Sequence, residues 1–476
     1  MNLVHFPAPP WHCQPVRLDD TIAAISTAQQ PSGLGVIRIS GPQAIAATES
    51  IFRSSSGTSP LSEAPSHQFR HGWVADAEGW VDEVLAVVMR APRSFTTEDV
   101  VELHCHGSVL VQQTILGLLI GQGVRLAEPG EFTRRAFLKG RLDLTRVEAI
   151  GDLIHARSKG GMRVAAQQLR GRLFESISAV QEQLVQVASL VEASIEFPEE
   201  GEKFTHREDC LHRIDHAVGE LEHMLAHADQ GRRLREGVAT ALIGRPNVGK
   251  SSLLNALLRE SRAIVTAVPG TTRDLIEETV QLHGLAFRLT DTAGLRETTN
   301  EVESEGVRRT RNTWTEAELV VLVVDQSQPP DAEDLHLIAE ADPALTLVVQ
   351  NKADLPSGRE GQDAWRAALQ GFESVRMSAT TGEGLELLEA RMVRRAMGGE
   401  LPRAEEVWIT NLRQQQSVQQ ALDALRQARI TLEQEAGEEY LAVDLRSALN
   451  ALGAVVGETT ADDLLARIFA EFCIGK

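Results

Sequence analysis

A short loop between a strand-like run and a helix-like run carries the clearest chemical signal in this sequence. Gly244-Arg-Pro-Asn-Val-Gly-Lys-Ser251 matches G-x-x-x-x-G-K-[ST], follows the apolar run 238–243 and precedes the amphipathic run 252–258. Glycines let backbone N–H groups approach phosphates, and a helix N-terminus adds positive potential. Lys250 suits the β- and γ-phosphates, and the Ser251 hydroxyl suits Mg²⁺. The loop therefore predicts a nucleoside triphosphate site.

Further segments indicate that the base is guanine. Asp291-Thr-Ala-Gly294 follows the run 285–290 and can serve the Mg²⁺ shell and the γ-phosphate. Asn351-Lys-Ala-Asp354 follows the run 345–350, and its aspartate can accept two hydrogen bonds that guanine offers and adenine does not. Ser378-Ala-Thr380 can place a backbone N–H near the base carbonyl, and the segment 270–274 can supply Thr272 to Mg²⁺. These motifs and their order predict that the chain binds GTP and GDP.

The predicted GTP-binding residues are Asn247, Val248, Gly249, Lys250, Ser251, Ser252, Thr266, Ala267, Val268, Pro269, Gly270, Thr271, Thr272, Asp291, Thr292, Ala293, Gly294, Asn351, Lys352, Ala353, Asp354, Ser378, Ala379 and Thr380.

Hydrolysis needs a group that orients water. Leu295 stands where Ras-type GTPases carry a water-orienting glutamine, and an apolar side chain cannot take that role. Three carboxylates follow closely, at Glu297, Glu301 and Glu303, and any of them can be delivered by a folding loop.

Length, charge and cysteine content limit which domain organisations, binding partners and cellular locations are expected. The 476 residues suggest several domains, and a net charge of −20 argues against dispersed, charge-driven binding of nucleic acid. Residues 125–175 are an exception with eleven Lys/Arg against six Asp/Glu, which fits either solvated helix faces or a surface for a polyanion. The four cysteines are far apart, and neither a signal peptide nor a membrane-spanning run is evident. We expect a cytoplasmic protein that does not contact membrane.

The changing pattern of β-type runs and helical periodicity along the chain predicts a multidomain fold of α/β plus α class. Short β-type runs alternate with turns from Asp20 to about Lys139, and we interpret residues 1–139 as an α+β domain. Helical periodicity follows over 140–233 and returns over 401–476. Between these stretches, residues 234–400 alternate strand and helix patterns, which is typical of a doubly wound, Ras-like G domain. The two helical segments are expected to form one domain into which the G domain is inserted.

Together with the flanking segments, these motifs make the chain resemble the tRNA modification GTPase family MnmE (TrmE). The markers are Asp20-Thr-Ile-Ala-Ala-Ile-Ser26, Gly35-Val-Ile-Arg-Ile-Ser-Gly41, Pro129-Gly-Glu-Phe-Thr-Arg-Arg-Ala-Phe137, Leu142-Asp-Leu144 and the terminal Phe472-Cys-Ile-Gly-Lys476. The resemblance implies an N-terminal domain that binds a tetrahydrofolate derivative, in its 5-formyl or methylene form. It implies folate contacts at Arg38, Glu102, Arg141 and Lys476, with Arg141 standing where the family usually has lysine.

The resemblance also implies partners and a reaction. The family is a homodimer that joins an FAD-dependent flavoprotein, MnmG (GidA), in a heterotetramer. Together they install an aminomethyl-type group, commonly carboxymethylaminomethyl, at C5 of the wobble uridine of certain tRNAs.

Similarity to potassium-activated GTPases implies a K⁺ site at Asn247, with main-chain oxygens of Thr266, Val268 and Thr271. It implies Mg²⁺ ligation by Ser251 and Thr272, G-domain dimerisation, and Glu303 as the catalytic carboxylate. The sequence departs from this pattern at Pro269 and Thr380, neither of which removes a needed hydrogen-bonding atom.

The sequence also allows other interpretations of the function and of single residues. A ribosome-assembly or signalling GTPase with flanking binding modules would share the nucleotide motifs. Cys473 is either a nucleophile or a partly buried structural thiol, and the second interpretation is preferred. His104-Cys-His106 is not expected to bind metal, because adjacent residues of a strand point to opposite faces.

Overall fold

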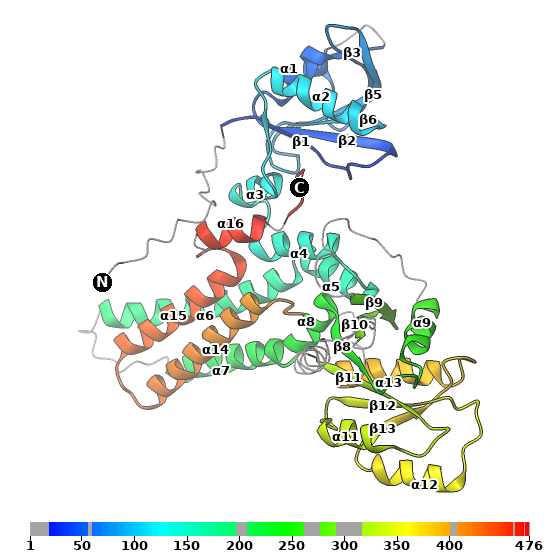
Figure 1. Cartoon of the computed structure of the whole chain (residues 1–476). Helices are drawn as coiled ribbons and strands as arrows, with labels where there is room; N and C mark the ends of the chain where they lie inside the picture. Colours follow the sequence, from blue (N-terminus) through cyan, green and yellow to red (C-terminus); the bar gives the residue numbers. More distant parts are fainter. Residues whose placement is uncertain are drawn as a thin grey trace, which may run out of the picture. The chain divides into compact units, whose positions relative to one another are not determined.

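The computed structural model describes residues 19–55, 60–196, 207–260, 277–291, 317–399, 407–459, 462–470 and 472–475. The chain divides into two compact units, drawn in Figure 1. The N-terminal unit holds the residues up to 151 together with those from 456 onward, and the central unit holds residues 152–455. None of the described helices is both long and apolar enough to cross a membrane.

A seven-stranded sheet organises the N-terminal unit, in the order β3-β4-β5-β6-β2-β1-β7. Its side chains alternate between two faces: Ile37 and Ile39 are fully buried in the core beside α1 and α2, and Arg38 between them lies on the other face. The elements are β1 (Ile22–Ile25), β2 (Ser32–Ser40), α1 (Ala44–Ile51), β3 (Phe52–Ser54), η1 (Leu61–Glu63), β4 (Phe69–Ala75), β5 (Trp80–Met89), β6 (Val100–Gly107), α2 (Val109–Gly121), β7 (Arg125–Leu126), α3 (Glu131–Leu138) and α16 (Asp462–Ala470).

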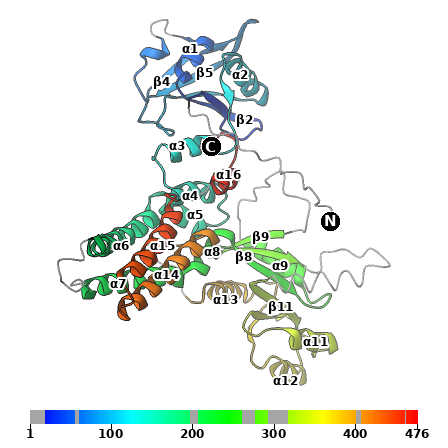
Figure 2. The ribbon, with the colours of Figure 1, turned by 90° about the vertical axis from the view of Figure 1, so that its left-hand side faces the viewer.

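Two distant chain segments form one helical bundle in the central unit. Helix α7 packs against both α6 and α14, and the long helices lie side by side in Figures 1 and 2. In α6 the buried Leu184, Val187 and Val191 recur at the three- and four-residue spacing of a single helix face. The helices are α4 (Leu144–Ile154), which runs across the boundary of the units, α5 (Lys159–Leu169), α6 (Arg172–Glu196), α7 (Arg207–Ala226), α8 (Ala228–Glu236), α14 (Leu412–Glu433) and α15 (Glu438–Val456).

The rest of the central unit is a six-stranded sheet in the order β13-β12-β11-β8-β10-β9, parallel except for the edge strand β9. Strand β11 is apolar along its length up to Asp325 because apolar clusters cover both faces of the sheet. The elements are β8 (Val238–Ile243), α9 (Lys250–Glu260), β9 (Glu277–Leu282), β10 (Leu285–Asp291), β11 (Leu319–Asp325), α11 (Ala332–Glu340), β12 (Thr346–Asn351), α12 (Arg359–Ala368), β13 (Glu373–Arg376) and α13 (Leu385–Met397).

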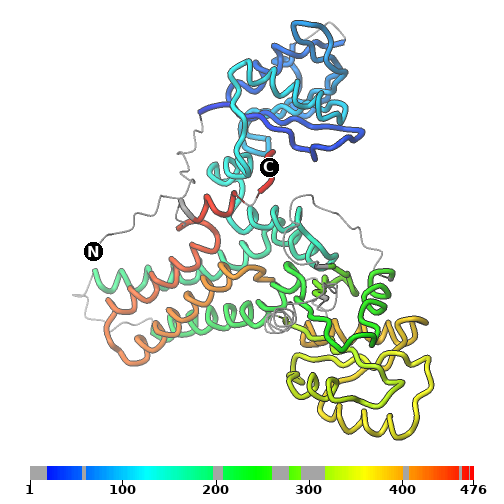
Figure 3. The backbone as a smooth tube through the Cα atoms, in the orientation of Figure 1, coloured from blue at the N-terminus to red at the C-terminus, as the bar shows by residue number. Residues whose placement is uncertain are grey.

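The α/β part is anchored to the bundle where the chain enters and leaves it. The chain enters through α8 and returns to α14, as Figure 3 traces. Val164 of α5, Leu234 of α8 and Trp408 belong to the same apolar cluster as the strand residues. The Gly160 N–H also donates to the Gly284 carbonyl at 2.8 Å, in the turn between β9 and β10. The predicted combination of an α+β domain, a two-segment helical domain and an inserted doubly wound domain is confirmed.

Candidate functional site

Among the described residues, the predicted nucleotide motifs lie where parallel strands end. Strand β8 leads into the loop 244–249, β10 ends at Asp291, β12 ends at Asn351 and β13 leads to Ser378. Pairing of β8 with β10 sets Asp291 opposite Leu242, just before the loop. Ligands bind at the carboxyl edge of such sheets. The sheet thus gathers segments that are more than one hundred residues apart in sequence.

The loop 244–249 has the backbone conformation that a phosphate cradle requires. Gly244, Asn247 and Gly249 adopt φ values of 147°, 63° and 103°. A Cβ atom at Gly244 would lie 2.3 Å from the Val323 carbonyl oxygen, so only glycine fits there. Lys250, 6% exposed, opens α9 and donates through Nζ to the carbonyls of Gly244 and Arg245, at 2.5 and 2.8 Å. These residues fit the phosphates of a nucleotide.

Asn351 ties the base-reading loop to the phosphate loop. Its Nδ2 donates to the Val248 carbonyl at 2.8 Å, and its Oδ1 accepts from the Ala379 N–H at 3.0 Å. Ser378, fully buried, accepts from the Thr381 N–H at 3.2 Å. One asparagine side chain therefore joins three of the predicted binding segments, and Asp354 is exposed at the end of the loop.

Asp325 contributes to this site although no nucleotide motif contains it. Its Oδ2 accepts from Lys352 Nζ at 2.7 Å, and its Oδ1 accepts from the Ser327 N–H and hydroxyl at 3.0 and 2.6 Å. Burial raises the pKa of the Asp325 carboxyl, but the hydrogen bonds from Lys352 and Ser327, together with the charge of Lys352, outweigh burial and leave that pKa below its ordinary value. The pair fixes a lysine whose backbone lies in the left-handed region, with φ 64°.

We predict that Asp325→Asn weakens GDP binding while kcat changes little, because Asp325 positions the base loop and touches no reacting group. A charge-assisted hydrogen bond contributes about 1.5–3 kcal/mol, so Kd should rise roughly 10- to 100-fold. Stopped-flow measurement of GDP dissociation, together with steady-state kcat, tests this. Ser327→Ala is the control, since it removes only a neutral hydrogen bond. A lower kcat with unchanged GDP dissociation would contradict the role.

Several predicted site residues lie outside the described residues. They are Thr266, Ala267, Val268, Pro269, Gly270, Thr271, Thr272, Thr292, Ala293, Gly294, Glu303 and Lys476.

A second group of predicted residues meets in the N-terminal unit. Arg38 and Glu102 are register partners on β2 and β6, with Arg38 Nε 2.9 Å from Glu102 Oε1. The guanidinium of Arg38 lies 5.4 Å from the centre of the Phe95 ring, and that of Arg141 lies 5.0 Å from it. Arg141 also donates to the Phe95 carbonyl at 2.7 Å. Arg38, Glu102 and Arg141 were predicted only from the resemblance to the family. Phe95 was not predicted as a site residue.

The C-terminal residues return to this group. Arg38 Nη1 and the Ser26 hydroxyl both contact the Gly475 carbonyl oxygen, at 3.5 and 3.2 Å. Gly475 has φ 96°, and a Cβ there would lie 2.5 Å from the Ile25 carbonyl oxygen. Cys473 is exposed, so the interpretation of a partly buried thiol was wrong. Phe472 and Gly475 are buried, whereas Cys473 and Ile474 between them are exposed.

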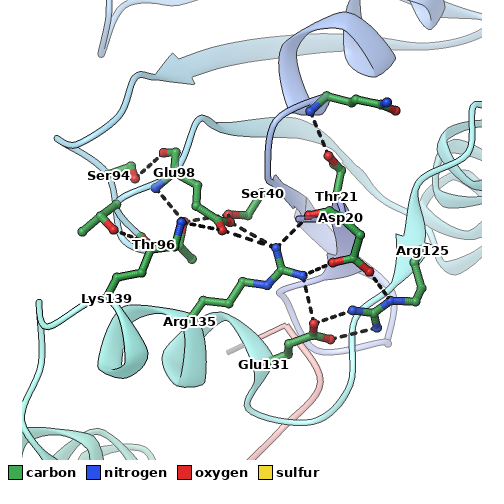
Figure 4. Close-up of polar contacts among 12 residues, drawn as sticks. Asp20, Thr21, Ser40, Ser94, Thr96, Glu98, Arg125, Glu131, Arg135 and Lys139 are labelled. Carbon is green, nitrogen blue, oxygen red and sulfur yellow. Dashed lines mark hydrogen bonds and ion pairs between the residues drawn. The ribbon is translucent and has the colours of Figure 1, made fainter. Parts of the chain in front are cut away.

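Figure 4 shows a buried network of charges beside this group. Arg135, 0% exposed, donates to Asp20 at 2.5 Å, to Glu131 at 3.1 Å and to Glu98 at 3.2 Å. Arg125 adds bonds to Asp20 and Glu131, at 2.7 and 2.5 Å. The network joins Asp20, just before β1, to the 94–98 loop, β7 and α3, so residues from the two sequence markers at 20–26 and 129–137 meet in it.

We predict that Arg135→Met destabilises the N-terminal unit by about 3–5 kcal/mol at pH 7, because it removes the buried cation that three carboxylates share and leaves their negative charges undercompensated. Burial raises the pKa of Asp20 and Glu131, but the hydrogen bonds from Arg125, and the charge of Arg135, leave both below their ordinary values. The network therefore stabilises the fold above about pH 4.5, and this contribution is lost as pH falls through the lowered pKa values. Scanning calorimetry of the full chain at pH 7 and pH 3 should show the defect shrinking in acid. The exposed Arg93→Met is the control.

The fold and the loop geometry define a phosphate-loop GTPase with a guanine-type base loop and two further domains. Residues 144–473 match the family model described as MnmE helical domain, and residues 21–141 match GTP-binding protein TrmE N-terminus. The chain belongs to the MnmE family of tRNA modification GTPases, and it is a GTP hydrolase.

Curated relatives agree over nearly the full length. The chain is 47% identical to tRNA modification GTPase MnmE of Symbiobacterium thermophilum over 460 residues, covering 96% of this chain and 100% of that protein. It is 42% identical to the protein of the same name from Natranaerobius thermophilus, with the same coverage.

Solved structures resemble parts of the chain. Era bound to MgGDPNP and 16S ribosomal RNA is 24% identical, covers 39% of this chain and 65% of its own, and has a TM-score of 0.27. The G domain of the Thermotoga maritima FeoB iron transporter is 31% identical, covers 33% and 97%, and has a TM-score of 0.24.

Proposed function

We propose that this chain hydrolyses GTP to drive aminomethyl-type modification, commonly carboxymethylaminomethyl, at C5 of the wobble uridine of certain tRNAs. The supporting observation is the joint presence of the guanine-nucleotide loops and the Arg38–Phe95–Arg141 group in a chain of this family. The reaction is proposed to take place with an FAD-dependent MnmG-type flavoprotein, in a heterotetramer built on a homodimer of this chain, in the cytoplasm.

In this proposal, bound nucleotide is held in three places. The amides of the loop 244–249 and Lys250 bind the phosphates, and Asp354 accepts the guanine donors. Ser251 and Thr272 bind Mg²⁺, which neutralises charge on the phosphates. Glu303 orients the attacking water.

K⁺ stimulation follows from the same proposal. Asn247, whose φ of 63° turns the loop backbone, would hold the ion with main-chain oxygens of Thr266, Val268 and Thr271. A cation beside the β- and γ-phosphates supplies the charge of an arginine finger.

We predict that hydrolysis is much faster in KCl than in NaCl at equal ionic strength, and that dimerisation of the G domains accompanies the faster rate. Phosphate release and light scattering with a GTP transition-state mimic measure both. Asn247→Ala should remove the difference between the salts. Equal wild-type rates in KCl and NaCl would exclude the K⁺ role.

The Arg38–Phe95–Arg141 group is proposed to bind the tetrahydrofolate derivative. Two guanidinium groups can pair with its carboxylates, and an aromatic face can stack on its rings. Glu102 and Lys476 would complete the site. When bound, the cofactor supplies the one-carbon unit, and the chain's residues orient it and hold its charge.

A reconstituted reaction tests the proposal. Purified chain, the flavoprotein, GTP, tRNA transcript, a nitrogen donor (glycine or an ammonium salt) and methylene-tetrahydrofolate labelled in the one-carbon unit should yield label in the wobble uridine. Omitting GTP or this chain should abolish the label. Full labelling without this chain would contradict the proposal, and Arg38→Ala should reduce labelling while GTP hydrolysis continues.

A further inference from the structure

Helix α5 of the central unit carries exposed basic side chains in a stretch of sequence without acidic residues. Between Arg157 and Phe174 the chain carries five basic side chains and no aspartate or glutamate. All five are exposed: Arg157, Lys159, Arg163, Arg170 and Arg172. Among the described residues, none of the five makes an ion pair with a carboxylate.

The helix geometry aligns three of these charges. At about 100° per residue, Lys159, Arg163 and Arg170 fall within roughly 40° of one another. The buried residues of α5, which include Val164 and Gln168, lie on the opposite side, packed toward α8 and the β9–β10 turn. With a rise of about 1.5 Å per residue, the stripe extends roughly 16 Å along the surface.

The stripe differs from an ordinary solvated helix face. On two other exposed helices, a basic residue pairs with an acid of the same helix, as Arg213 does with Asp209 and Arg366 with Asp363. In α5 a lysine also occupies the first turn, where the helix dipole disfavours positive charge. Local stability therefore does not account for this arrangement.

We propose that the α5 stripe, formed by Lys159, Arg163 and Arg170, binds the phosphate backbone of tRNA. Phosphates are the groups that unpaired arginines and lysines recognise. Because the whole chain carries a net charge of −20, most of its surface repels a polyanion, and contact must concentrate on such a stripe. This inference rests on the proposed tRNA substrate and adds where the chain holds it.

Fluorescence anisotropy with a labelled, unmodified tRNA transcript tests the inference on the full chain. Replacing all three residues, as K159E/R163E/R170E, should raise Kd at least 30-fold in 100 mM salt. The slope of log K against log salt should fall in magnitude by about two, since three phosphate contacts are lost. GTP hydrolysis should remain normal, because the substituted side chains lie opposite the packed face. A control variant reverses two exposed arginines of α12, Arg359 and Arg366, and should leave the tRNA affinity within a few-fold of wild type.

Two outcomes would overturn the inference. One is unchanged tRNA affinity and salt slope in the triple variant, even if the labelling reaction with the flavoprotein succeeds; the proposed function would then stand and the stripe would not. The other is selective loss of binding to phosphatidylserine vesicles with tRNA binding intact, which would assign the stripe to a lipid surface.

Discussion

Asp354→Asn is expected to lower GDP affinity roughly 30- to 1,000-fold and to shift preference toward xanthosine diphosphate. In the proposed site the carboxylate would accept two donors of guanine, and an amide cannot accept both, so a loss of about 2–4 kcal/mol is expected. Xanthine replaces the exocyclic amine with a carbonyl, which the amide can serve as a donor. Displacement of a fluorescent GDP analogue by GDP and by XDP measures the switch.

The control for this experiment is Asp363→Asn, an equally conservative change on exposed α12. It should leave both affinities unchanged. Unaltered GDP affinity in Asp354→Asn would show that the loop 351–354 does not read the base, although Asn351 links it to the phosphate loop.

Glu303→Ala is expected to reduce GTP turnover by about 10²–10⁴ while GDP and GTP affinities stay near wild type. Binding draws on Lys250, the loop amides and Asp354, none of which needs this carboxylate. Hydrolysis needs a group that orients water, and Leu295 cannot supply one. Single-turnover hydrolysis in saturating K⁺, with nucleotide dissociation measured in parallel, separates the two effects.

Glu297→Ala and Glu301→Ala are matched controls, because they remove the same charge from the same segment. Both should retain most of the turnover. A loss in Glu301→Ala equal to that in Glu303→Ala would show that the segment acts through its total charge, and normal turnover in Glu303→Ala would place the catalytic carboxylate elsewhere.

Local patterns predicted much of the central unit. The run 238–243 coincides with β8, and the run 345–350 is offset by one residue from β12. Helix α9 begins at Lys250, two residues before the predicted helical run. These elements could be predicted because the apolar runs and glycines that determine them lie within a few residues of one another in the sequence. The docking of Gly475 beside Ile25 joins opposite ends of the chain, and no local pattern specifies it.

In the candidate site too, local motifs were predictable and contacts between distant segments were not. Motif spacing identified the loops at 244–251 and 351–354, and the structure joins them through Asn351. Asp325 also ends an apolar strand at the carboxyl edge of the sheet. Since ligands bind at that edge, its position at the end of the run 319–325 could have identified it as a candidate, although it belongs to no nucleotide-binding motif. Two partners of Arg135, Asp20 and Glu98, come from distant segments, and only the folded chain reveals them; the third, Glu131, lies one turn away on the same helix. Glu303 lies outside the described residues, so its role stays a prediction.

The most direct test of the account asks whether tRNA modification depends on the phosphate loop of this chain. Cells lacking the chain would be complemented with wild type or with Lys250→Ala, expressed at equal levels, and their tRNA nucleosides analysed by mass spectrometry. The account predicts that wild type restores the C5-modified wobble uridine and that Lys250→Ala leaves it missing. Normal modification in cells with no copy of the chain, or full restoration by Lys250→Ala, would contradict it.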